Sequence, residues 1–258
     1  MEIKSKKLDQ LNKKMLACSQ CILRSSCTQV VPGEGPAEAE IMFIGEGPGK
    51  KVDELGRPFV GAAGKFLDEM LKMINLNRED VYPHTKKTSN KDTDYKNTPE
   101  QKKNNFGVGV YIANVVKCRP PQNRDPMPEE VEACWPWLME QIKTIQPKLI
   151  VTLGRHSMER FLPSQKISQI HGKAMRRNIP KMGPYVFYAL YHPAAALYNG
   201  SMREVLIQDF KKIPKVLEAV KKSEANSSQD IITTAEAGSG KDETPPIEPE
   251  ENKQETLF

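Results

Sequence analysis

The sequence IMFIGEGPG, residues 41–49, begins with four apolar residues and ends in a glycine-rich turn. A short, continuous apolar run bounded by turn residues is typical of a strand that is buried on both faces. Three further runs share this pattern: VYIANVVK (110–117), LIVTL (149–153) and VFYAL (186–190). The chain is therefore predicted to contain four buried strands, each followed by a turn or loop.

Segments with helical spacing of apolar residues lie between these runs. In the clearest of them, apolar residues recur between Phe66 and Ile74 at intervals of three and four. Helices are expected near residues 5–17, 59–74, 128–145, 155–162 and 201–220. Strands that alternate with helices predict a parallel sheet covered by helices on both faces. In such a sheet, ligands bind where the carboxyl ends of the strands open into loops.

The net charge of +5 over 258 residues is unevenly distributed. Residues 222–258 hold three lysines and nine acidic residues, a net charge of −6, so residues 1–221 carry +11. A basic body predicts a polyanionic partner, although dispersed charge that only aids solubility would give the same total. We assign residues 1–221 to one folded domain. By composition, residues 222–258 are predicted to be a disordered acidic tail.

Residues 84–107 are polar and nearly free of aliphatic side chains. They are predicted to form a flexible insertion in the domain, because they cannot bury enough apolar surface to order themselves. No stretch approaches the ~18 consecutive apolar residues of a membrane span, and the amino terminus lacks the apolar core of a secretory signal. We therefore expect a soluble, cytoplasmic, prokaryotic protein that is monomeric and has no membrane partner.

Five cysteines in a cytoplasmic protein of this length argue against a disulfide framework and for metal or redox use. Cys18 and Cys21 form a C-x2-C pair, whereas Cys118 and Cys134 flank a proline-rich loop. Four thiolates from separate segments can ligate a zinc ion or an iron–sulfur cluster, and the long spacing of the second pair fits zinc fingers poorly. Buried core thiols are the alternative. Cys27 stays unassigned.

Three polar residues lie where the predicted strands end. Glu46 lies in the turn after the first strand, Asn114 lies within the second run, and His192 follows the last. A glycine-rich turn can also cradle phosphate, but the proline of this turn removes a backbone donor and no Lys-Ser/Thr pair follows. Taken alone, each of these three residues could equally have a structural role. His156 and His171 have no such context and are interpreted as structural.

Taken together, the motifs resemble the family-four, iron–sulfur type of uracil-DNA glycosylase. The resemblance covers about residues 10–215, without the insertion, and its stretches and cysteines occur in the family's order. The stretches are GEGPGKKVDELGRPFVGAAGKFL (45–67), YIANVVKCRPPQNRDPMPEEVEACWPWL (111–138), PKLIVTLG (147–154) and YHPAAAL (191–197). The resemblance implies an archaeal source and a three-layer α/β/α fold with a short central parallel sheet. It also implies a structural [4Fe-4S] cluster held by Cys18, Cys21, Cys118 and Cys134.

The resemblance further implies the reaction. Deoxyuridine would be flipped out of single- or double-stranded DNA and its N-glycosidic bond hydrolysed, which leaves an abasic site and starts base-excision repair. Glu46 would be the catalytic carboxylate that stabilises an oxocarbenium-like sugar and orients water. His192 would hydrogen-bond uracil O2 and favour departure of the anionic base.

Substrate binding is assigned to residues near these two. Gly45 and Gly47 would let the backbone approach the base and aim N–H groups at a uracil oxygen. Phe59 would stack on the flipped base. The Asn114 carboxamide can pair with uracil N3–H and O4, groups that cytosine presents with the opposite polarity. Leu197 is predicted to enter the DNA as a wedge for the vacated stack.

The chain departs from the family at Val52-Asp53, where the family usually has Glu-Asp. Discrimination against thymine is therefore expected to depend on the bulk of Val52. Family-five enzymes, which also remove hypoxanthine, are the nearest alternative, but they usually lack an acidic residue at the position of Glu46. A non-catalytic iron–sulfur module that docks on DNA is the other alternative. The joint presence of Glu46, Asn114 and His192 argues against it.

The chain ends in KQETLF, residues 253–258. Gln-x-x-Leu followed by an aromatic resembles the start of the peptides that dock on sliding clamps of the PCNA type, although the usual paired aromatics are incomplete here. We predict that Gln254–Phe258 binds such a clamp at the end of a long tether. A frayed terminus is the alternative, because motifs this short often arise by chance.

Overall fold

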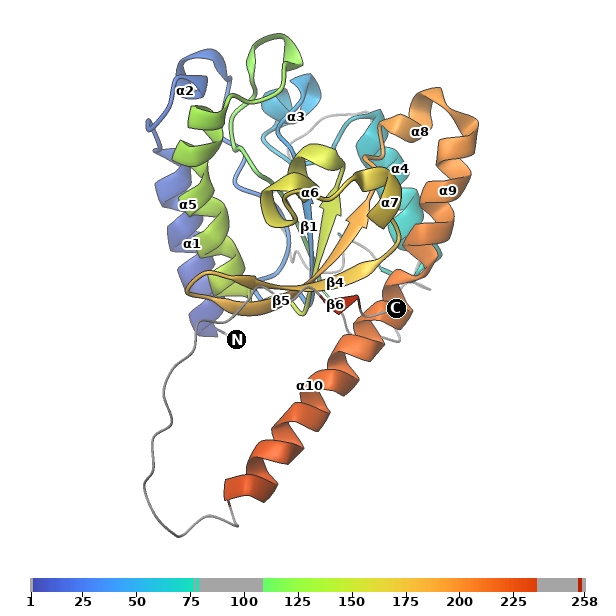
Figure 1. Ribbon diagram of the computed structural model, residues 1–258. Helices are drawn as coiled ribbons and strands as arrows, with labels where there is room; N and C mark the ends of the chain where they lie inside the picture. Colours follow the sequence, from blue (N-terminus) through green and yellow to red (C-terminus); the bar gives the residue numbers. More distant parts are fainter. Residues whose placement is uncertain (1, 77, 79–108, 236–254, 257–258) are drawn as a thin grey trace, which may run out of the picture.

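The computed structural model describes residues 2–76, 78, 109–235 and 255–256 (Figure 1). Its sheet has the strand order β2-β1-β3-β5-β4-β6. The first four strands in this order are parallel and correspond to the predicted apolar runs. They are β1 (Ile41–Gly45), β2 (Val110–Asn114), β3 (Leu149–Leu153) and β5 (Gly183–Leu190).

The far edge of the sheet is antiparallel. Strand β4 (Ala174–Ile179) pairs with β5, and β6 (Glu255–Thr256) pairs with β4. The sheet is thus mixed: its predicted central part is parallel, and an antiparallel edge that the apolar runs did not predict is added to it. The apolar-run criterion misses β4 because this strand carries Arg176, Arg177 and Asn178, which are half-buried or exposed. An antiparallel strand near an edge can leave one face in water.

Helices cover both faces of the sheet (Figure 1), which confirms the predicted three layers. Strand β1 shows the reason, because Met42 and Ile44 pack into one core while Ile41 and Phe43 pack into the other. The first core lies under α1 (Glu2–Leu16), α5 (Pro128–Ile145) and α6 (Arg155–Phe161). The second lies under α4 (Ala62–Met73), α9 (Gly200–Lys211) and α10 (Ile213–Ala235).

Short helices occupy many of the connections. They are α2 (Leu23–Ser26), α3 (Lys50–Leu55), η3 (Pro121–Asn123), α7 (Ile167–Ile170) and α8 (Ala195–Tyr198). The single helix expected over 201–220 is two helices, α9 and α10, with Lys212 between them. Pro214 lacks the N–H that a continuous helix would donate to the carbonyl of Phe210, so a helix ends here.

The segment after residue 221 differs from the prediction. Helix α10 continues to Ala235, where composition predicts disorder from Lys222 onward, and Glu255–Thr256 form β6. Several good helix formers follow Val220, and they extend the helix that packs on the core. The predicted insertion 84–107 and the rest of the tail lie outside the described residues. Among the described helices, none is long and apolar enough to cross a membrane.

Candidate active site and cysteine cluster

A cavity of about 690 Å³ opens at the carboxyl ends of β1, β2 and β5. Three connections between strands and helices supply its wall. Nearly all of the residues assigned to chemistry or substrate binding line it: Glu46, Gly47, Phe59, Asn114, His192 and Leu197. The fold therefore brings together side chains that lie almost 150 positions apart in the sequence.

Gly45 does not line the cavity, but its lack of a side chain leaves space for Asn114 and Phe59. A Cβ atom at Gly45 would lie 2.5 Å from Asn114 Oδ1 and 2.7 Å from Phe59 Cζ. At Gly47, which does line the cavity, it would lie 2.8 Å from Val116 Cγ2. Both glycines are needed because a side chain would push the neighbouring site residues out of place.

Phe59 is held rigidly by its surroundings. Its backbone is left-handed, with φ 53°, and its side chain is buried. Gly64 permits this conformation, because a Cβ there would lie 1.7 Å from the Phe59 carbonyl oxygen. The buried Arg78 guanidinium donates to the carbonyls of Pro58 and Phe59 over 2.8 and 3.2 Å, and Asp68 accepts from it over 2.8 Å. The aromatic ring is thus fixed before any ligand arrives.

Asn114 presents an unsatisfied polar atom to the cavity. The side chain is buried, and its Oδ1 has no hydrogen-bond partner within the described part of the chain. Its main-chain carbonyl accepts from Lys117 Nζ over 2.7 Å, and Lys117 is in turn held by Gln141 Oε1 over 2.6 Å. An unpaired buried amide oxygen is costly unless a ligand completes it.

His192 is held as a neutral donor. Its Nδ1 accepts the backbone N–H of Ala194 over 3.1 Å, so the neutral ring carries its proton on Nε2. Burial lowers the pKa of His192 to about 4, because the charged imidazolium is poorly solvated there. Near neutral pH the side chain can therefore donate a hydrogen bond without carrying charge.

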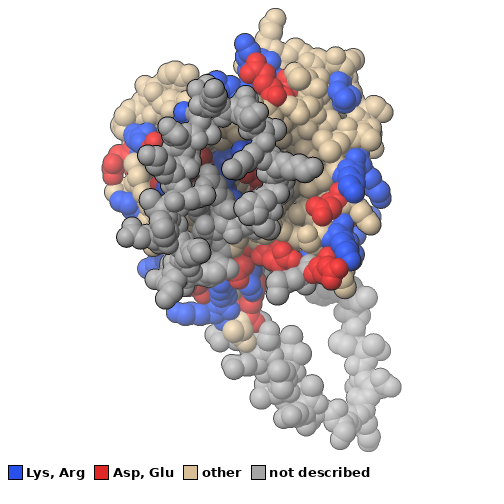
Figure 2. Space-filling model, turned by 180° about the vertical axis from the view of Figure 1, so that it is seen from behind, with Lys and Arg blue, Asp and Glu red and all other residues tan. Residues whose placement is uncertain are grey.

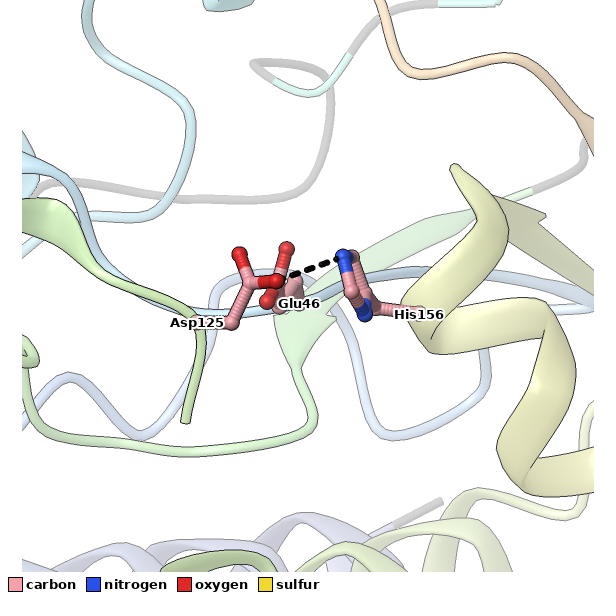
Figure 3. A group of neighbouring side chains, drawn as sticks. All are labelled: Glu46, Asp125 and His156. Atoms are coloured by element: carbon pink, nitrogen blue, oxygen red, sulfur yellow. Dashed lines mark ion pairs between the residues drawn. The ribbon is translucent and has the colours of Figure 1, made fainter. Parts of the chain in front are cut away.

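Glu46 has two neighbours that the sequence interpretation did not place in the site. Figure 3 shows the Asp125 carboxylate and the His156 imidazole beside Glu46, and His156 Nε2 lies 3.2 Å from Asp125 Oδ2. Asp125 lines the cavity, and His156 is the second residue of α6, the helix after β3. The interpretation of His156 as merely structural missed this position. The one available signal was its place directly after Gly154-Arg155 at a strand end.

The mouth of the cavity carries exposed apolar side chains on α8. Leu197, the predicted wedge, is 40% exposed, and the adjacent Tyr198 is 91% exposed. Both residues line the cavity. Asn199 fixes the following turn, because its Oδ1 accepts the backbone N–H groups of Ser201 and Met202. Sequence reasoning did not single out Tyr198, which extends the apolar rim.

The family departure at Val52-Asp53 separates into two roles. Val52 is buried and lines the cavity. Asp53 is also buried, and it accepts the backbone N–H groups of Thr28 and Gln29 over 2.9 and 3.4 Å. Asp53 thus ties helix α3 to the segment after the first cysteines, while Val52 takes up space in the cavity wall.

The four predicted ligand cysteines meet at a second, small cavity. Cys18, Cys21, Cys118 and Cys134 all line it, between the end of α1 and the start of α5. All four are free thiols. Two N–H groups reach these sulfur atoms: Trp137 Nε1 donates to Cys18 Sγ over 3.3 Å, and the Lys117 amide donates to Cys134 Sγ over 3.2 Å.

The donor set fits a metal or an iron–sulfur cluster. Burial raises the pKa of the Cys118 thiol well above its usual range, and the nearby thiols of Cys27, Cys134 and Cys21 raise it further. Burial also raises the pKa of Cys134. Four crowded thiols would share one small cavity as neutral groups, whereas a bound cation replaces their protons and stabilises the thiolates.

Charge does not gather into one basic patch on the face shown in Figure 2. Among its coloured residues, Lys and Arg side chains lie next to Asp and Glu side chains. Among the described residues, ion pairs such as Arg203–Glu69, at 2.8 Å, and Arg57–Glu34, at 2.7 Å, also bring opposite charges together. The positive charge predicted for the body is therefore dispersed over this face.

The fold and the two cavities define an α/β domain with a ligand site at the strand ends and a four-thiol centre close to it. Residues 32–220 match the family model of the uracil DNA glycosylase superfamily. A type-4 uracil-DNA glycosylase of Archaeoglobus fulgidus is 42% identical over 80% of this chain and 91% of that protein. One from Sulfurisphaera tokodaii is 41% identical, over 80% and 83%. A type-5 uracil-DNA glycosylase of Pyrobaculum aerophilum is 28% identical over 66% and 67%. The chain belongs to the uracil-DNA glycosylase superfamily.

Proposed function

We propose that this protein is a type-4 uracil-DNA glycosylase, which hydrolyses the N-glycosidic bond of deoxyuridine in DNA. The observation that carries the proposal is the buried Asn114 carboxamide. Its unpaired oxygen lies in the wall of the same cavity as Phe59, His192 and Glu46. Higher identity to type-4 than to type-5 enzymes also supports it.

Recognition of the base would use the fixed part of the cavity. The flipped uracil stacks on Phe59, whose ring is held in place by the contacts of its backbone. Asn114 Oδ1 accepts from N3–H, and its Nδ2 donates to O4. Cytosine offers the reverse pattern at these atoms, so it would leave both amide groups unsatisfied.

Bond cleavage would use the two groups assigned to catalysis. As the C1′–N1 bond breaks, the electron pair leaves with uracil, and His192 Nε2–H stabilises the negative charge that develops on O2. The Glu46 carboxylate stabilises positive charge on the sugar and orients the water that adds to C1′. A neutral His192 suits this role because it can donate from Nε2 without placing a positive charge on a buried ring.

Cys18, Cys21, Cys118 and Cys134 would hold a [4Fe-4S] cluster. The free thiols, their shared cavity and the two N–H···S hydrogen bonds support this assignment. When bound, the cluster would supply cross-linking between α1, the loop after β2 and α5. No step of the reaction requires it.

The test is release of uracil from a single-stranded oligonucleotide that contains one deoxyuridine. Matched oligonucleotides with thymine or hypoxanthine test whether the activity is specific for uracil, as expected of a type-4 enzyme, or broader, as expected of a type-5 enzyme. Glu46→Gln keeps the shape of the side chain but removes its charge, and it is expected to slow excision about 10²–10⁴-fold. Absence of uracil release by the wild-type protein, with intact DNA binding, would favour a docking module instead.

A sliding clamp is the proposed protein partner, bound through Gln254–Phe258. The sequence supports this, because two large apolar residues, Leu257 and Phe258, follow the mainly polar stretch 248–256. The tether would hold the enzyme near DNA without altering the active site. Docking would require Glu255 and Thr256 to leave their pairing with β4.

A further inference from the structure

A histidine–aspartate pair lies beside Glu46 and has no role in the mechanism proposed above. Asp125 comes from the loop after β2, His156 comes from α6, and Glu46 follows β1. The nearest carboxylate and imidazole atoms of the three residues all lie within 4.8 Å of one another. In Figure 3 the two carboxylates face each other, and the imidazole ring lies beside them. Three separate segments thus converge on the catalytic carboxylate.

We propose that His156, held by Asp125, is a positioning residue that sets the charge and orientation of the Glu46 carboxylate during excision. The inference rests on the proposed function, because it assigns a purpose to Glu46's neighbours in that reaction. His156 does not line the cavity and would act through Glu46 rather than on DNA. Its contact with Asp125, at 3.2 Å, fixes the position of the ring.

The electrostatics of the cluster explain why a partner is needed. Burial raises the pKa of Glu46, and the neighbouring Asp125 carboxylate raises it further. His156 opposes this rise more than any other group, with smaller contributions from Arg155 and Arg160. Two carboxylates side by side repel each other, and positive charge next to both relieves the repulsion. His192 faces the same cavity but remains uncharged near neutral pH.

One oxygen of the Glu46 carboxylate has no hydrogen-bond donor within the described residues. This atom, Oε1, is buried. A carboxylate without a donor depends on nearby charge to stay ionised. Both partners are partly exposed, since the His156 side chain is 30% and the Asp125 side chain 65% exposed. Substitutions at these two positions should therefore leave the fold intact.

The proposal is tested by the pH dependence of single-turnover uracil excision in His156→Gln and Asp125→Asn. The rate should fall as the pH drops through the pKa of Glu46, because excision needs the ionised carboxylate. His156→Gln removes a group that lowers this pKa, so the acid limb should move to higher pH. A displacement of half to one pH unit would slow excision about three- to tenfold on that limb. Asp125→Asn keeps an oxygen that can accept from His156 but removes the charge that raises the pKa of Glu46, so its acid limb should move to lower pH.

Opposite displacements by two neighbouring substitutions would not follow from simple loss of structure. His171→Gln is the matched control, because His171 also pairs with an aspartate, Asp209, at 2.6 Å but does not line the cavity. Its acid limb should coincide with that of the wild type. DNA affinity should be unchanged in all three variants.

Two results would overturn the inference alone. The first is an active wild-type protein whose pH profile coincides with that of His156→Gln. The second is excision that depends on an added divalent cation in the wild type but not in His156→Gln, since it would make the three side chains a metal site. A wild-type protein that releases no uracil would overturn the proposed function and this inference together.

Discussion

The Phe59 ring lies over the His192 imidazole, with the ring centroids 5.7 Å apart and the planes inclined by 28°. This contact joins the base-stacking platform to the group that would meet the departing base. An apolar ring over an imidazole also keeps water away from it, in line with the lowered pKa of His192. The contact between Phe59 and His192 therefore both fixes the proposed stacking ring and favours the neutral form of His192.

This burial predicts how stability varies with pH. The pKa of His192 is about 4 in the folded protein, below the ~6.5 of an unfolded chain. Between these values the unfolded state binds more protons, so the free energy of unfolding should fall as the pH drops from ~6.5 towards 4. His192→Asn removes this contribution, and its stability should vary less over that window. Urea unfolding at a series of pH values measures how the free energy of unfolding changes with pH in the wild type and in His192→Asn. Equal pH dependence in the two proteins would contradict the prediction.

Asn114→Asp should weaken recognition of uracil. A carboxylate can accept from N3–H but cannot donate to O4, and its charge is costly in a buried position. We expect kcat/KM for uracil release to fall about 10²-fold, the scale of a lost polar contact in a buried site. The exposed Asn75→Asp is the matched control and should retain full activity. Equal activity of the two variants would show that Asn114 does not read the base.

Part of this site could be predicted from the sequence because local patterns carry it. Strand β1 is a continuous apolar run that ends in glycine, and the strand-end rule then places Glu46, Asn114 and His192 at one edge of the sheet. Strand β4 could not be found this way, since its polar residues break the apolar pattern. The Asp125–His156 contact joins the loop after β2 to helix α6. Such contacts depend on how the helices pack, which no local pattern specifies.

The cysteine cluster yields a spectroscopic prediction. Purified wild-type protein should be brown and contain about four irons per chain. Cys118→Ser should lose iron, colour and thermal stability together, because Cys118 lines the shared thiol cavity. Cys27→Ser is the control: Cys27 lies near Cys118 but not in the wall of that cavity, so iron content should be retained. A colourless, active protein with one zinc ion would exclude the iron–sulfur assignment.

The last prediction concerns the carboxyl terminus, where one short segment has two competing uses. Glu255 and Thr256 pair with Arg176 and Met175 of β4, while the peptide Gln254–Phe258 resembles a clamp-docking motif. A segment cannot add to the sheet edge and extend into a clamp groove at once, so clamp binding should displace it from β4. The active-site cavity contains neither β4 nor β6, and displacement should therefore leave catalysis unchanged.

Deletion of residues 254–258 separates these consequences. The truncated protein should excise uracil from short oligonucleotides at the wild-type rate, because Glu255 and Thr256, the described residues among those deleted, do not line the cavity. It should bind the sliding clamp of its own organism at least tenfold more weakly in calorimetry, because the docking side chains are gone. A fluorescent peptide of residues 250–258 should bind the same clamp and be displaced by the full-length protein. If the truncated and full-length proteins bind the clamp equally well, the tail does not dock there, and its pairing with β4 is the only contact left for it among the described residues.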